Sequence, residues 1–199
     1  MQVVPIYPVL IYQGMANNAN VIQSDFKRVF EQLIADDKFQ RREPHQHRIS
    51  DTKFSGNMIA EFQLDTFEKE VLSQAEQYLK MIGWNTVNIS LKITESWMTL
   101  TNQGEFAPKH EHGASDMSGV FYVDTAGTDG QLYFASPTKQ CQSSLLFAAT
   151  QPIMSVPPTD NMFILFPGWL EHGISTQTTP GNRISVSFNI KATKNKGQK

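Results

Sequence analysis

The residues of this chain best suited to chemistry are two histidines that stand one residue apart. His110 and His112 lie in the stretch FAPKHEHGASDMSGVFY, which runs from Phe106 to Tyr122. Side chains two residues apart on a β-strand point to the same face, so a strand here would present two imidazoles side by side, with Glu111 turned away. Two neutral imidazoles on one face are the start of a site for a divalent first-row metal.

A third histidine would complete such a site. His172 lies in FPGWLEHGIS, after the apolar run MFILF and a Pro-Gly turn. It stands 60 positions after His112 (172 − 112), which is enough chain for several strands to bring the two segments together. The remaining histidines, His45 and His47, have the same spacing as the first pair but sit in the charged segment RREPHQHRIS. We expect them to form a solvent-exposed pair in a mobile loop.

An arginine in an apolar strand is the next candidate. Arg183 and Ser185 share one face of the run RISVSFNI, and Arg183 follows His172 by 11 positions (183 − 172). A guanidinium holds a carboxylate through two parallel hydrogen bonds, and a nearby hydroxyl can add a third. A buried arginine without an anion is costly. An acidic residue of the protein is the simpler partner for Arg183 alone, but the histidine upstream favours the carboxylate of a ligand.

The N-terminal half predicts supporting elements and no chemistry. Residues 3–12 are apolar but contain two prolines, which indicates an edge strand or an extended arm. Apolar residues at helical spacing predict a helix over about residues 20–35, followed by a loop with one short strand over 36–57. A second helix is expected from Asp65, with Glu68 completing a capping box and Gly83 as the C-cap.

From Val87 onward, short apolar runs alternate with turns that carry Gly, Pro, Asn and Asp. About eight short strands at such intervals indicate an all-β sandwich or barrel. We therefore expect a single domain over residues 1–199 that is mainly β with N-terminal helices, a jelly roll. Its parts are an N-terminal arm and bracing helices (1–86), the jelly-roll core (87–190) and a flexible tail (191–199).

Composition narrows the class of protein. The chain has 199 residues, a formal charge of −2 and 40% hydrophobic residues, which suits one globular domain. It has no basic block that would favour a nucleic-acid partner and no apolar run of about 20 residues for a membrane helix. Its N-terminus lacks the features of a signal peptide, so we expect a cytoplasmic protein. The single cysteine, Cys141, excludes an internal disulfide and lies in a polar segment where we expect no catalytic role.

The two motif-bearing stretches together resemble the Fe(II)- and 2-oxoglutarate-dependent oxygenase superfamily, which has a double-stranded β-helix (jelly-roll) core. In that superfamily a histidine, a carboxylate two residues later and a distal histidine hold the iron. An arginine about ten residues after the distal histidine, often followed by a serine two further on, binds the C5 carboxylate of 2-oxoglutarate. Gly104 resembles the glycine that precedes the first ligand in prolyl-hydroxylase-like members.

More narrowly, residues 87–190 resemble a family of 2-oxoglutarate/iron oxygenases found in marine bacteria and their phages. The shared features are a tryptophan like Trp97, the H-x-H pair, an S-G-V-x-Y run like Ser118 to Tyr122 and the ending R-I-S-x-S-F-N. The resemblance implies Fe(II) and 2-oxoglutarate as cofactors, with His110, His112 and His172 as the metal ligands. Arg183 and Ser185 would bind 2-oxoglutarate, and Tyr122 would add a hydrogen bond.

One departure from the superfamily pattern concerns the carboxylate ligand. Its position holds His112 here, which leaves the site with one more positive charge than two histidines and a carboxylate provide. Asp116, four residues later, and Glu111, if the strand is bulged, are alternative ligands that would restore the usual set. The sequence alone leaves these three candidates open.

The resemblance implies hydroxylation of a substrate C–H bond with O2, releasing succinate and CO2. A cupin-like dioxygenase with three histidines and no 2-oxoglutarate is an alternative that explains the missing carboxylate but not the Arg183–Ser185 pair. A non-catalytic jelly-roll binding or assembly module is a third, and the N-terminal arm offers a route to a homodimer. The substrate is not indicated, although aromatic residues near the expected mouth would suit a pocket: Phe106, Phe121 and Trp169.

Overall fold

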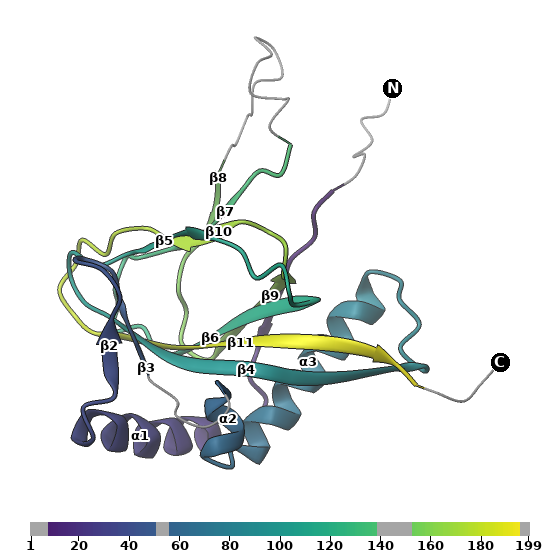
Figure 1. The fold of residues 1–199 in the computed structure, drawn as a ribbon, viewed down its shortest axis with the longest axis horizontal. Coiled ribbons are helices and arrows are strands. Elements are labelled where there is room, and N and C mark those ends of the chain that lie inside the picture. Colours follow the sequence, from purple (N-terminus) through teal and green to yellow (C-terminus); the bar gives the residue numbers. More distant parts are fainter. Residues whose placement is uncertain (1–7, 51–55, 139–152, 196–199) are drawn as a thin grey trace, which may run out of the picture.

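The computed structural model describes residues 8–50, 56–138 and 153–195, and within them two antiparallel sheets and three helices (Figure 1). The helices are α1 (Ala19–Ala35), α2 (Met58–Glu61) and α3 (Asp65–Met81). The strands of the larger sheet are β1 (Tyr12–Met15), β2 (Phe39–Arg41), β3 (Arg48–Ser50), β4 (Ile89–Thr101), β6 (Met117–Asp124), β9 (Met162–Pro167) and β11 (Arg183–Lys194). Those of the smaller sheet are β5 (Ala107–His110), β7 (Leu132–Ala135), β8 (Ile153–Val156) and β10 (His172–Ile174).

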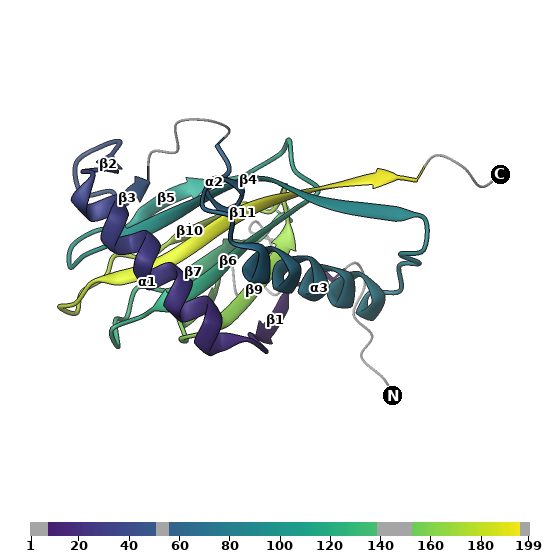
Figure 2. The same ribbon diagram turned by 90° about the horizontal axis from the view of Figure 1, so that it is seen from below.

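The two sheets face each other, and the helices cover the far side of the larger one (Figures 1 and 2). The larger sheet has the strand order β1-β9-β6-β11-β4-β3-β2, and the smaller one the order β5-β10-β7-β8. This is the two-sheet jelly roll with N-terminal helices that the strand pattern predicted. None of the helices in the described part of the chain has the length and apolar character that a bilayer crossing requires.

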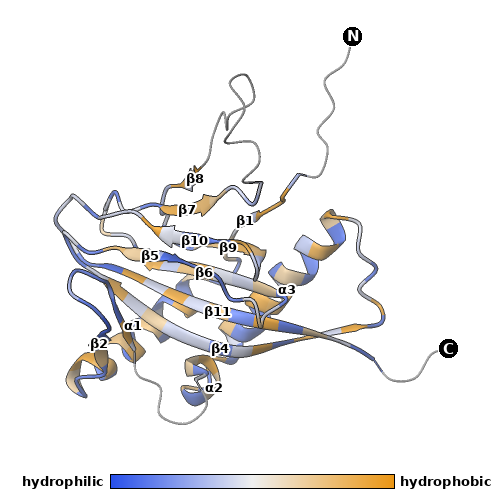
Figure 3. Cartoon of the chain, turned by 45° about the horizontal axis from the view of Figure 1, so that its top comes forward, coloured by the Kyte–Doolittle hydropathy of each residue, from blue (hydrophilic) through white to orange (hydrophobic). Residues whose placement is uncertain are grey.

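The larger sheet separates two hydrophobic clusters, because successive residues of a strand point to opposite faces. On β6, Phe121 and Val123 pack against the helices, whereas Val120 and Tyr122 face the smaller sheet. The helix-side cluster includes the buried stripes of both long helices, which alternate with hydrophilic residues in Figure 3. These stripes are Ile22, Phe26, Val29 and Leu33 of α1 and Phe67, Val71, Ala75 and Tyr78 of α3.

The predicted helices are confirmed, but the caps of α3 differ from the prediction. Helix α3 begins at Asp65, yet its N-cap is Leu64 and no side chain caps it, so the expected capping box is wrong. Its C-terminal end differs from the prediction by one residue: the C-cap is Ile82, and Gly83 follows it with a φ of +89°, a conformation that favours glycine. The loop predicted over residues 36–57 contains two strands, β2 and β3, rather than one.

The N-terminal apolar segment forms an edge strand, as expected, but later than its apolar run begins. Strand β1 starts at Tyr12, beyond both prolines, and pairs antiparallel with β9. Proline lacks the N–H that a ladder needs, which explains the late start. Residues 3–7 of this segment, the predicted strand over SLLFA and Cys141 lie outside the described residues.

Candidate metal centre

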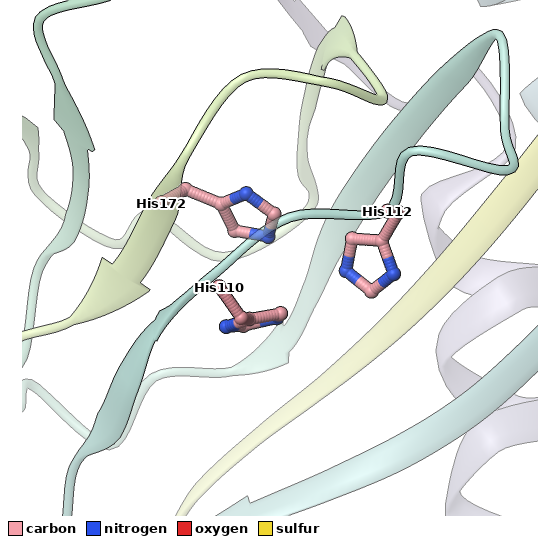
Figure 4. Close-up of side chains that lie close together, drawn as sticks. All are labelled: His110, His112 and His172. Atoms are coloured by element: carbon pink, nitrogen blue, oxygen red, sulfur yellow. The ribbon is translucent and has the colours of Figure 1, made fainter.

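Two of the three candidate histidines are direct cross-strand neighbours in the smaller sheet. His110 ends β5 and His172 begins β10, and the antiparallel register pairs these two residues. Their ring centroids lie 4.5 Å apart. The strand pairing therefore brings together two side chains that are far apart in the sequence (Figure 4).

His112 joins them by a different route from the one expected. Strand β5 ends at His110, so the same-face argument for a continuous strand does not apply to His112. Instead its backbone N–H donates to the carbonyl of Gly168 over 2.8 Å. A Cβ on Gly168 would lie 2.3 Å from the carbonyl oxygen of Ser115, so only glycine allows the two loops to approach this closely.

The three imidazoles can share one ion. One ligand atom from each of His110, His112 and His172 lies within 4.8 Å of the other two. The ring of His112 lies 5.0 Å from that of His110 and 5.2 Å from that of His172, between centroids. Figure 4 shows the three rings grouped around a common space.

Backbone carbonyls fix two of the rings in the form that a metal needs. The Nδ1 atoms of His110 and His172 lie 2.8 Å from the carbonyl oxygens of Pro108 and Leu170, respectively. A carbonyl only accepts, so each Nδ1 carries the proton and each Nε2 keeps its lone pair. Metal-binding histidines usually have such a partner on the other nitrogen.

Burial keeps two of the imidazoles neutral. Desolvation lowers the pKa of His172 to about 3 despite the bond to Leu170, and the neighbouring His110 and His112 lower it further. Desolvation and His110 lower the pKa of His112 to about 4, against the opposing effect of Glu95. Near neutral pH these rings therefore offer lone pairs rather than positive charges.

A polar network that the sequence did not reveal surrounds His112. The side-chain nitrogen of Asn189 on β11 lies 3.4 Å from Nδ1 of His112 and donates to Glu95 on β4 over 2.6 Å. The hydroxyl of Ser118 donates to the side-chain oxygen (Oδ1) of Asn189 over 2.8 Å. The register of three adjacent strands assembles this network, and Glu95 places a carboxylate near His112.

The alternative carboxylate ligands lie elsewhere. Asp116 accepts a hydrogen bond from the backbone of Ala192 over 2.8 Å and lies 3.8 Å from the ammonium of Lys191. Neither Asp116 nor Glu111 belongs to the cluster of ligand atoms within the described residues. This placement favours His112 over Asp116 as the third member of the cluster.

Arg183 is fully buried without a carboxylate partner in the described part of the chain. Its guanidinium donates to the carbonyl oxygen of Gly130 and, over 3.3 Å, to the hydroxyl of Thr101, while its Nε has no partner there. Burial lowers the pKa of Arg183, whereas Tyr122 and Asp129 raise it. The guanidinium stays charged, because an arginine in a protein does not lose its proton.

A row of hydroxyl side chains lies beside this guanidinium. In the register of the larger sheet, Ser185 stands between Tyr122 on β6 and Thr99 on β4. All three are buried, and the hydroxyl of Thr99 has no partner within the described residues. Burial raises the pKa of Tyr122 to about 12, so its hydroxyl keeps its proton and can donate. Arg183 and this row are a group of hydrogen-bond donors of the kind that carboxylates accept.

Gly130 makes room for the guanidinium. A Cβ at this position would lie 2.7 Å from a terminal nitrogen of Arg183. The sequence marked Gly130 only as part of a turn, because nothing local indicates which distant side chain packs against it.

A cavity of about 840 Å³ lies between the sheets and includes the histidine cluster. Its wall includes His110, His112, His172, Tyr122 and His47. Its volume is in the range of small-molecule sites. Arg183 and Ser185 are not part of the wall and lie just behind it, covered by their neighbours.

The expected loop pair of histidines separates in the structure. His45 is exposed, with a φ of +63°, and its left-handed conformation breaks the extended alternation that would place both rings on one side. His47 is partly buried and lines the cavity, so the expectation of an exposed pair is wrong for His47.

The aromatic residues expected near the mouth have different positions. Phe121 is fully buried in the helix-side cluster, so the prediction that it lines the pocket is wrong. Trp169 is half exposed, and neither it nor Phe106 is part of the cavity wall. Trp97 does line the cavity, and its ring centroid lies 5.7 Å from that of His112.

Comparisons with known proteins agree with this architecture. Residues 95–189 match the family described as "Putative 2OG-Fe(II) oxygenase". A prolyl-4-hydroxylase from Pseudomonas putida is similar in structure, with a TM-score of 0.58 and 13% identity, and the match covers 92% of each chain. No curated protein sequence matches the chain significantly.

Two further solved structures share the fold. HygX from Streptomyces hygroscopicus, with nickel, 2-oxoglutarate and hygromycin B bound, has a TM-score of 0.60 and 11% identity, covering 92% of this chain and 83% of HygX. A prolyl hydroxylase from Trichoplax adhaerens, in complex with a hypoxia inducible factor peptide fragment, has a TM-score of 0.63 and 10% identity. That match covers 90% of this chain and 82% of the hydroxylase.

The segment that contains all three histidines and Arg183 defines the class: a non-haem iron oxygenase with a jelly-roll core. Through residues 95–189 the chain belongs to the family of 2OG-Fe(II) oxygenases. Membership implies Fe(II) and 2-oxoglutarate as cofactors and O2 as a co-substrate. The donor set fits the metal, since three neutral imidazoles suit a divalent first-row ion.

Proposed function

We propose that this chain is an Fe(II)- and 2-oxoglutarate-dependent dioxygenase that hydroxylates its substrate with release of succinate and CO2. His110, His112 and His172 hold the iron, and Arg183, Ser185 and Tyr122 bind the far carboxylate of 2-oxoglutarate. One observation carries the proposal: three imidazoles from two distant segments meet in one cavity, close to a buried guanidinium that has no acidic partner among the described residues.

The protein's own residues orient the metal ligands and attract the cosubstrate. Backbone carbonyls hold the rings of His110 and His172 so that Nε2 faces the ion site. Arg183 supplies a fixed positive charge for a dicarboxylate. Bound Fe(II) supplies the activation of O2, which no side chain of the site can provide.

The decisive experiment separates the metal from the cosubstrate. Purified protein with Fe(II) and 2-oxoglutarate should release succinate, and Arg183→Ala should weaken 2-oxoglutarate binding at unchanged iron content. Equal loss of iron and 2-oxoglutarate in this variant would make Arg183 a structural residue. Absence of both succinate release and 2-oxoglutarate binding in the wild-type protein would overturn the proposal.

A second function has one observation in its favour. The cluster contains three imidazoles and no carboxylate, which is the donor set of a cupin-like dioxygenase that works without 2-oxoglutarate. The two functions differ in one measurement on protein loaded with Zn²⁺, a divalent metal without redox chemistry. 2-Oxoglutarate should raise the melting temperature if it binds, and leave it unchanged if the cupin-like function is correct.

The substrate class stays open in this proposal. The similar structures carry different molecules, a peptide fragment in one and hygromycin B in another, so the shared fold does not select a substrate. The wall near His112 includes Trp97 and Glu95, and it is the part of the cavity where we expect substrate to approach the metal.

A further inference from the structure

His47 is a cavity residue that neither the metal cluster nor the expected cosubstrate anchor uses. It lies in the connection between β2 and β3, part of a different region of the chain from every other candidate site residue. Its ring lines the cavity, and its Nδ1 atom is buried without a hydrogen-bond partner among the described residues. A buried polar atom without a partner loses its bonds to water and gains nothing in return, so the structure leaves a place for a ligand atom there.

The backbone around His47 is firmly held. Its N–H donates to the carbonyl of Phe106 over 3.0 Å, and the N–H of Phe106 donates to the carbonyl of His45 over 3.1 Å. Nearby, Arg41 forms an ion pair with the buried carboxylate of Glu105. These contacts tie the β2–β3 connection to the segment that leads into β5, so His47 keeps its position relative to His110.

The groups that lower the pKa of His47 include two arginine side chains, which are cations. Arg183 has the largest effect, followed by His110 and Arg42, and together with the dominant effect of burial they lower the pKa of His47 to about 4. His47 therefore lies within electrostatic reach of both Arg183 and the metal cluster. A neutral imidazole in this position can donate an N–H to an anion that the surrounding positive charge attracts.

The position of Arg183 adds a second argument. Its surface is fully covered and is not part of the cavity wall, whereas His47 is part of that wall. Tyr122 is part of the wall as well, whereas Ser185 is covered, so the hydrogen-bond donors that the cavity itself offers to a carboxylate include Tyr122 and His47. His47, with its buried and unpartnered Nδ1 among the described residues, adds a second donor to that of Tyr122 on this side.

We infer that His47 is a binding residue for 2-oxoglutarate, whose Nδ1–H donates a hydrogen bond to the carboxylate that Arg183 receives. The inference rests on the proposed function and extends its cosubstrate site to the β2–β3 connection. Because the acceptor of this hydrogen bond is the distal carboxylate, His47 would favour a dicarboxylate over a keto acid that lacks the second carboxylate. It would thus contribute to cosubstrate selectivity as well as affinity.

The test compares two substitutions that differ in whether they keep an N–H. His47→Leu removes the N–H, and His47→Asn keeps an N–H close to the place of Nδ1. Dissociation constants are measured by calorimetry on Zn²⁺-loaded protein, with 2-oxoglutarate and with 2-oxobutyrate, a keto acid that lacks the distal carboxylate. His45→Ala is the matched control from the exposed side of the same connection, and zinc content is determined for each variant.

We expect His47→Leu to raise the dissociation constant of 2-oxoglutarate about ten-fold or more, as the loss of a hydrogen bond to a charged group predicts. His47→Asn should stay within about three-fold of the wild type, and His45→Ala should match it. None of the three should change zinc content or the affinity for 2-oxobutyrate. Equal weakening of both keto acids by His47→Leu would show a structural role and overturn the inference.

Two further outcomes keep this inference distinct from the proposed function. If the wild type binds 2-oxoglutarate, Arg183→Ala does not, and His47→Leu binds it as the wild type does, the proposed function stands and the role of His47 is wrong. If the wild type itself binds no 2-oxoglutarate, the proposed function fails and the role of His47 fails with it.

Discussion

The two faces of strand β11 belong to different parts of the molecule, the hydrophobic core and the candidate site. Val186, Phe188 and Ile190 are fully buried in the cluster that packs against the helices. The alternate residues point the other way, towards the space between the sheets, and all are polar: Arg183, Ser185, Ser187 and Asn189. One strand therefore supplies part of the hydrophobic core and part of the site, with a period of two residues.

The difference between the two faces shows how the fold can tolerate a buried guanidinium: the apolar face supplies the stabilising free energy. On the helix face, the ring of Phe67 contacts those of Phe121 and Phe163 with centroids 5.2 and 5.7 Å apart. On the other face, Arg183 and Thr99 have buried polar atoms with no hydrogen-bond partner in the part of the chain that the structure describes. Burial of apolar area on one side offsets the cost of these buried polar groups on the other.

The largest expected effect comes from the helix face. Phe188→Ala should lower the free energy of unfolding by about 3–5 kcal/mol, because it opens a cavity among buried rings. Ser187→Ala, the adjacent residue on the opposite face, is the control and should change it by less than about 1 kcal/mol. Chemical denaturation measures both values. Equal effects of the two substitutions would contradict the division of the strand.

On the site face, His172→Ala should reduce the affinity for a divalent metal by more than about 100-fold, since outer partners of ligands alone account for about 10–100-fold. The metal-free variant should remain folded. Metal titration followed by competition with a chelator measures the loss, and Asp116→Asn is the control because its side chain binds the backbone of Ala192 instead. A large loss in Asp116→Asn and none in His172→Ala would reverse the assignment of ligands.

The free energy of unfolding of the metal-free protein should depend on pH because of the histidines on the site face. In the unfolded chain a histidine takes up a proton near pH 6.5, but burial lowers the pKa of His172 to about 3 and that of His112 to about 4 in the folded state. The unfolded state binds more protons in this window, so the free energy of unfolding should fall as the pH falls below about 6.5. The effect should be measured between pH 7 and 5, above the range where carboxylates titrate.

The control for this measurement is His172→Ala, which should show a smaller decrease over the same range because one of the buried imidazoles is gone. An identical pH profile in the variant and the wild type would mean that His172 is not held neutral by the fold.

The smallest expected effect concerns a glycine. Gly130→Ala places a methyl group 2.7 Å from a terminal nitrogen of Arg183 and should displace the guanidinium by a few tenths of an ångström or more. We expect 2-oxoglutarate to bind about ten-fold more weakly, because misplaced hydrogen bonds to a charged group lose most of their strength. Gly127→Ala, in the same turn region, has no atom within 4 Å of an added Cβ but a φ of +66°, so it shows the effect of backbone strain without this contact. Calorimetry with Zn²⁺-loaded protein measures both.

Local patterns in the sequence were enough to predict the helices, the edge strand and the series of short strands, and to single out His110, His112, His172 and Arg183 as candidate site residues. Periodicity of two or 3.6 residues depends on neighbours in the chain, so a sequence displays it directly. The chemical types of those four side chains already indicated a metal and an anion.

Other features depended on contacts between distant segments, which no local pattern contains. The left-handed backbone at His45 sent His47 into the cavity although the pair has the spacing of the ligand pair. Register between strands placed Asn189 beside Glu95 and Ser118, and packing decided that Gly130 and Gly168 must lack side chains. The sequence by itself determined which groups this protein has for chemistry, and only the tertiary structure decided which of them meet, because meeting depends on strand pairing across 60 or more residues.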